Sequence, residues 1–93
     1  MEKKARAHLI VHGRVQGVCF RMETRKAAAV FDVCGWVRNQ PDGTVETVVE
    51  GDRADVTSLI NWCRSGPPAS SVEKVDITWQ EYRGEFGEFS IRY

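Results

Sequence analysis

The pattern of apolar and polar positions predicts five strands and two helices. Stretches rich in apolar and β-branched residues indicate strands over residues 6–12, 35–39, 44–51 and 72–79. A short last strand is predicted from residues that alternate along it, namely Phe89, Ile91 and Tyr93. Between these stretches the apolar spacing changes to the period of a helix.

Two segments have helical spacing. The first runs from about residue 20 to near residue 32, and its apolar face consists of Phe20, Ala27 and Phe31. The second carries a stripe at i, i+3, i+4 and i+7, made of Val56, Leu59, Ile60 and Cys63. We expect Asp52 to be the N-cap residue of this second helix, and residues 66–68 (Gly-Pro-Pro) to end it.

The order of these elements predicts the fold class. Residues 40–43 (Gln-Pro-Asp-Gly) have the composition of a tight turn, so the second and third strands form a hairpin. The order β-α-β-β-α-β, followed by a short C-terminal strand, is that of an α+β, ferredoxin-like sandwich. We expect a mainly antiparallel sheet with both helices on one face, built by residues 1–93 as a single domain.

Composition and charge exclude several classes of protein. Hydrophobic residues make up 42% of the 93 residues and the net charge is zero, which argues against disorder and against a general nucleic-acid binder. No apolar run approaches the ~20 residues that span a bilayer, and no apolar segment follows the basic N-terminus, so neither a membrane anchor nor a secretory signal is predicted. Three cysteines without a Cys-x-x-Cys pair favour a cytoplasmic location, and neither they nor two histidines predict a metal site.

The charge is divided unevenly, and the positive half carries the candidate chemistry. Residues 1–40 hold eight basic and three acidic residues, a balance of +5, whereas the rest of the chain has a balance of −5. In a βαβ unit the end of the first strand, the start of the helix and the end of the second strand meet at one edge of the sheet. The loop 13–17, Arg21 and Asn39 therefore come together there. Loop amides, a helix N-terminus and a guanidinium suit a phosphate group. On spacing alone, a solvated Arg21 and an Asn39 that merely starts a hairpin remain an alternative.

Two long motifs give the chain a recognisable resemblance. Residues 11–21 (VHGRVQGVCFR) and 35–46 (GWVRNQPDGTVE) resemble the two signatures of the acylphosphatase family, and residues 66–69 and 89–93 are similar as well. The resemblance covers nearly the whole chain and implies the ferredoxin-like fold and hydrolysis of acyl phosphates. It implies that Arg21 and Asn39 are catalytic, and that no metal or organic cofactor is used. The implied phosphate loop consists of Arg14, Val15, Gln16, Gly17, Val18, Cys19 and Phe20.

The mechanism expected from this resemblance needs no nucleophilic side chain. Water attacks phosphorus in line with the leaving carboxylate, the loop amides and Arg21 hold the phosphate oxygens, and Asn39 holds the water. The water's proton passes to the phosphate itself. Inorganic phosphate or sulfate competes for the site, and nothing demands more than a monomer. The sequence departs from the family at Asp32, where members often have glycine, so a left-handed backbone there would carry some cost.

Two other functions remain open at this point. The first is a binding module that keeps the phosphate site without turnover, or a regulatory or acyl-phosphate-handling domain of a larger enzyme, because the family's domain also occurs fused to other activities. The chain begins and ends at the domain boundaries, which favours a free-standing enzyme. A single-stranded RNA-binding sheet is disfavoured because strand 44–51 has no aromatic residue. Among other residues, we expect Glu46 and Glu50 to face solvent, Trp36 to lie in the core and His12 to occupy an ordinary strand position.

Overall fold

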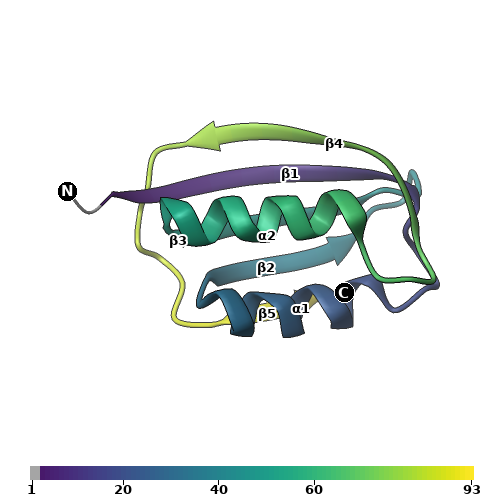
Figure 1. Cartoon of the computed structure of the whole chain (residues 1–93), viewed down its shortest axis with the longest axis horizontal. Coiled ribbons are helices and arrows are strands. Elements are labelled where there is room, and N and C mark those ends of the chain that lie inside the picture. Colours follow the sequence, from purple (N-terminus) through teal and green to yellow (C-terminus); the bar gives the residue numbers. More distant parts are fainter. Residues whose placement is uncertain (1–2) are drawn as a thin grey trace.

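The computed structural model describes residues 3–93 and has the element order predicted from the sequence. The elements are β1 (Lys4–Arg14), α1 (Phe20–Phe31), β2 (Cys34–Asn39), β3 (Val45–Asp52), α2 (Arg53–Ser65), β4 (Ser71–Gln80) and β5 (Phe89–Arg92). The strands form one sheet in the order β4-β1-β3-β2-β5, and both helices cover the same face of it (Figure 1). The predicted ferredoxin-like α+β fold is confirmed. No helix within the described residues has the length and apolar character needed to cross a membrane.

The sheet topology determines which ends of the strands meet. β3 pairs antiparallel with both β1 and β2, so β1 and β2 run in the same direction with β3 between them. The end of β1, the start of α1 and the end of β2 therefore lie at one edge of the sheet. β5 pairs in parallel with β2, so its C-terminal end reaches the same edge. The elements predicted to form the site therefore meet at one edge of the sheet, and the C-terminal end of β5 joins them there.

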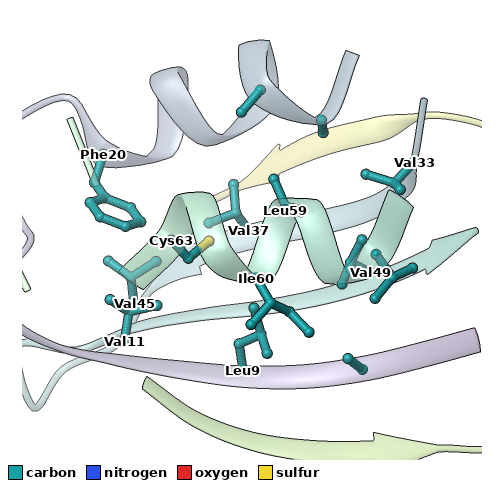
Figure 2. Packing of buried hydrophobic residues seen from close by; sticks show 14 of the residues in the cluster. Leu9, Val11, Phe20, Val33, Val37, Val45, Val49, Leu59, Ile60 and Cys63 are labelled. Carbon is teal, nitrogen blue, oxygen red and sulfur yellow. The ribbon is translucent and has the colours of Figure 1, made fainter. Parts of the chain in front are cut away.

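The core lies between the sheet and the two helices (Figure 2). From β1 it takes every second residue, and from α2 the predicted stripe, of which Val56, Leu59 and Cys63 are fully buried. Burial raises the pKa of the Cys63 thiol to about 12, so this thiol is neutral in the folded protein. The apolar side chains that recur with the helical period on α2 and with the two-residue period on the strands thus pack together in one layer.

The residues predicted at the end of α1 and at the start of α2 occupy those positions. Asp32 has φ 58° and ψ 48°, so it ends α1 in the left-handed conformation that the comparison with glycine suggested. Asp52 stands at the N-cap position of α2, but its carboxylate makes no capping hydrogen bond and accepts one from Lys4 Nζ at 2.6 Å. The predicted N-cap position of Asp52 is therefore confirmed, although its side chain contributes no capping hydrogen bond. The carbonyl of Lys3 instead accepts the Arg53 N–H at 2.9 Å.

The face of the sheet opposite the helices contradicts the prediction that two glutamates face solvent. Glu50 is 3% exposed, because the connection between β4 and β5 packs against it. Its carboxylate accepts hydrogen bonds from Arg6 Nη1 at 3.2 Å and from three successive backbone N–H groups of that connection, those of Arg83, Gly84 and Glu85. The side chain of Glu46 is 13% exposed and lies between His8 and Arg38, at 2.7 and 2.6 Å.

Trp36 is buried on this same face rather than in the apolar layer beneath the helices. The guanidinium carbons of Arg38 and Arg92 lie 5.3 and 4.4 Å from the centre of its ring. Two cation–π contacts thus cover the indole. Trp36 packs as a structural residue and does not flank the site.

Candidate active site

A pocket of about 330 Å³ opens at the predicted edge of the sheet. It is lined by Val15, Gly17, Cys19, Phe20, Arg21, Met22, Asn39, Ile91 and Tyr93. These residues come from the loop after β1, the first turn of α1, the end of β2 and the end of the chain. The pocket therefore brings Arg21 and Asn39 together, 18 positions apart in the sequence, as the topology argument expected.

Two residues of the loop before α1 have a left-handed backbone. Gly17 has φ 74° and Cys19 has φ 62°, both in the left-handed region. A non-glycine residue there costs about 1–3 kcal/mol, and such strain gathers at functional sites. The Cys19 side chain does not cap α1, and Cys19 O accepts from the Glu23 N–H at 3.0 Å. The first N–H groups of the helix thus lie at the pocket, with the positive end of the helix dipole.

The predicted phosphate loop divides into residues that line the pocket and residues that do not. Val15, Gly17, Cys19 and Phe20 line it, whereas the side chains of Arg14, Gln16 and Val18 do not. Arg14 is exposed at the end of β1, and Val18 packs against the apolar core. Gln16 reaches to the turn between β2 and β3, where its Nε2 donates to the carbonyls of Gln40 and Thr44. Phosphate binding by the loop amides remains a prediction.

Arg21 is held by the end of the chain. Its Nη1 donates to Arg92 O at 3.5 Å, and its guanidinium carbon lies 4.8 Å from the centre of the Tyr93 ring. The sequence argument missed Met22, Ile91 and Tyr93 as lining residues. Ile91 and Tyr93 alternate along the last strand and so lie on one side of it. Together with a parallel pairing of that strand with β2, this alternation would have placed both residues at the pocket.

Among the side chains that line the pocket, one is charged and most are apolar. Arg21 is the charged side chain among its lining residues, and none of them is Asp, Glu or His. Met22 and Tyr93 are 47% and 97% exposed at its mouth. His12 bonds Asp76 at 2.8 Å on the face of the sheet away from the helices, so it lies outside the pocket, in an ordinary strand position as expected. The lining thus offers a guanidinium, an amide and backbone N–H groups, but no side chain suited to be a general base.

The turn that follows Asn39 is held together by hydrogen bonds between its own residues. Asp42 Oδ1 accepts from the hydroxyl and the N–H of Thr44, at 2.6 and 3.0 Å. The hydroxyl and then the N–H of Thr44 lower the pKa of Asp42 below its ordinary value. Asp42 is thus an anionic turn residue.

Among residues 3–93 there is no cluster of three His, Cys, Asp or Glu side chains that is arranged to hold a metal ion.

The sequence profile of the acylphosphatase family matches residues 7–91. The chain belongs to the acylphosphatase family. It is 54% identical over 90 residues to the acylphosphatase of Pelotomaculum thermopropionicum, covering 97% of this chain and 98% of that protein. It is 49% identical over 90 residues to the acylphosphatase of Pyrobaculum islandicum, covering 96% and 95% of the two chains.

Solved structures give the same result. The crystal structure of acylphosphatase from Bacillus subtilis superimposes with a TM-score of 0.92 at 35% identity, covering 96% of this chain and 99% of that one. An acylphosphatase from Coxiella burnetii gives 0.90 at 35% identity, covering 96% and 93%. The chain is therefore a hydrolase of the acylphosphatase family with an acyl phosphate as substrate.

Proposed function

We propose that this enzyme cleaves acyl phosphates by direct attack of water on phosphorus, in a site formed by loop 14–20, Arg21 and Asn39. The observation that carries the proposal is the convergence of Arg21 and Asn39 on one pocket at the N-terminus of α1. The pocket supplies positive charge and N–H donors on one side and a neutral amide on the other. That combination fits a phosphate dianion together with a water molecule.

Phosphate binding is assigned to the backbone and to Arg21. Gly17 and Cys19 have left-handed backbone conformations, and turns of this kind can bring successive N–H groups to one side as an anion-binding nest. The guanidinium of Arg21 presents two parallel donors, which match two phosphate oxygens. In a loose transition state the charge is spread over the three equatorial oxygens, and these donors stabilise it there.

Asn39 orients the attacking water. Its amide oxygen accepts a hydrogen bond from the water while its amide nitrogen donates to the phosphate. Because no Asp, Glu or His side chain lines the pocket, the water's proton is transferred to a phosphate oxygen of the substrate. The P–O bond to the carboxylate breaks as the bond to water forms, so the products are a carboxylate and inorganic phosphate.

The proposed chemistry also predicts which ligands compete with the substrate, and the free cysteines suggest the compartment. Inorganic phosphate and sulfate carry the same oxygens as the substrate, so we expect both to compete for the pocket. Three free cysteines, among them the exposed Cys19, suit a reducing compartment, and we propose a cytoplasmic monomer that uses no cofactor.

The test is hydrolysis of benzoyl phosphate by the purified protein in the presence of a chelator. We expect turnover with the chelator present, and a loss of about 10²–10³ in kcat for Arg21→Gln, the usual effect of removing an oxyanion donor. Asn39→Ala should lower kcat strongly while phosphate still inhibits with nearly unchanged affinity. The matched controls are Arg25→Gln and Asn61→Ala, which change exposed residues of the same types on the two helices. Full activity of Asn39→Ala would remove this residue from the mechanism.

A further inference from the structure

We propose that the side chain of Gln16 is a positioning element, which holds the phosphate loop at a fixed distance from Asn39. This inference rests on the proposed function, because it assumes that the loop and Asn39 act on the same substrate. Gln16 lies between two lining residues, yet its side chain is directed away from the pocket. Its amide nitrogen donates to Gln40 O at 2.7 Å and to Thr44 O at 2.8 Å, so both of its hydrogens are used.

The two carbonyls that Gln16 binds belong to a rigid turn. Gln40 N–H donates to Thr44 O at 2.9 Å, and Gly43 N–H donates to Gln40 O at 3.1 Å. The Gln40 Nε2 donates to Glu46 Oε1 at 3.1 Å, and Gln40 Oε1 lies 2.8 Å from the Thr44 hydroxyl, whose single hydrogen it shares with Asp42 Oδ1 at 2.6 Å. These bonds hold residues 40–44 in one conformation, and we call this hydrogen-bonded turn the fixed body. By binding Gln40 and Thr44, the Gln16 side chain is therefore attached to the fixed body.

This fixed body is continuous with Asn39. Asn39 directly precedes Gln40 and pairs with Val45 in the sheet, so the turn closes the same hairpin that carries Asn39. The phosphate loop is attached to that body through Gln16. Among the hydrogen bonds of residues 3–93, those of Gln16 are the ones that join loop 14–19 to residues 39–44.

The fold itself does not provide this link. The loop and Arg21 extend from β1 and α1, whereas Asn39 extends from β2, and β3 separates the two strands. The distance between the phosphate and the water therefore depends on packing across two strand pairs. In-line attack is sensitive to that distance, since a displacement of about 1 Å can cost about 10²-fold in rate. The Gln16 bridge spans the gap directly at the edge where the chemistry takes place.

Two substitutions remove the bridge without shortening the side chain. Gln16→Met has a similar length and no donor, and Gln16→Glu puts an acceptor against two carbonyl oxygens. We expect Gln16→Met to lower kcat for benzoyl phosphate at least about tenfold and Gln16→Glu to lower it further. The inhibition constant of inorganic phosphate should change less than about twofold, because loop amides and Arg21 remain. The control is Gln80→Met, which removes a glutamine that bonds Arg6 at the opposite edge of the sheet.

A double-mutant cycle distinguishes positioning from general stabilisation. If Gln16 acts by positioning Asn39, then Gln16→Met should change the residual kcat of Asn39→Ala by less than about twofold. An equal loss in both backgrounds, a parallel loss of phosphate affinity, or an unchanged kcat in Gln16→Met would overturn the inference. These outcomes leave the proposed function intact, whereas a fully active Asn39→Ala would contradict the proposed function itself.

Discussion

The buried carboxylate of Glu50 offers the sharpest test of how this fold is held together. Replacing it by glutamine keeps the shape of the side chain but removes the charge. Glu50 accepts from three successive backbone N–H groups and from Arg6, and it is 3% exposed. In Glu50→Gln the amide NH₂ is turned against N–H donors, which leaves at least one of them without an acceptor at a cost of about 1–3 kcal/mol. The weakened pairing with Arg6 adds a similar amount, so we expect a loss of about 3 kcal/mol.

The loss should be large in a thermal melt and should depend on pH. For a chain of this size about 1 kcal/mol corresponds to ~4–8 °C, so we expect Tm to fall by ~12–24 °C at pH 7. Burial raises the pKa of Glu50, but the backbone N–H groups and Arg6 outweigh it, so this pKa lies below its ordinary value of 4.5. The charge therefore contributes its full stability above about pH 4.5, and that contribution is lost as the pH falls through the folded-state pKa.

Circular dichroism melts of both proteins from pH 7 to pH 3 measure this effect. The difference in Tm between the parent and Glu50→Gln should shrink as the parent's carboxylate becomes protonated. Glu73→Gln, which changes an exposed glutamate on β4, is the control and should stay within about 0.5 kcal/mol of the parent. Glu50 lies at the opposite end of β3 from the pocket, so kcat at 25 °C should be unchanged. A Tm difference that is absent at pH 7, or that grows in acid, would refute the reasoning.

Three further results are expected. Arg21→Lys should recover little of the activity lost in Arg21→Gln, because a point charge does not reproduce two parallel donors; steady-state kinetics with benzoyl phosphate measures this. Sulfate at about 100 times its Kd should stabilise the fold by about 2.7 kcal/mol, seen as a rise in Tm that is absent in Arg21→Gln. Gly35→Ala should destabilise severely or prevent folding, because at φ 146° its Cβ would lie 1.9 Å from Val48 O. Gly87→Ala, which meets nothing within 4 Å, should melt like the parent.

Most of the architecture could be predicted because it depends on local patterns. The stripe on α2 is buried as its spacing indicated, and Asp32 adopts the left-handed conformation expected where α1 ends. Arg21 and Asn39 could be brought together from the element order because the two strands of a βαβ unit run parallel and the helix between them runs back, so that the start of the helix and the ends of both strands share one edge. These inferences need only the period of each element and the order in which the elements follow one another.

Other features were decided by contacts between segments far apart in the chain. Tyr93 reaches Arg21 because β5 pairs in parallel with β2, and the spacing of apolar residues does not report which strands are neighbours. Glu50 looks like a solvent-facing strand residue until the connection after β4 brings three N–H groups to it. Gln16 acquires its partners from a turn 24 and 28 positions later. The sequence by itself thus determined the elements and the chemical groups of the site, and the tertiary structure decided which polar groups satisfy one another. The physical reason is that a hydrogen bond across the fold depends on how separate elements pack, and no local period encodes that packing.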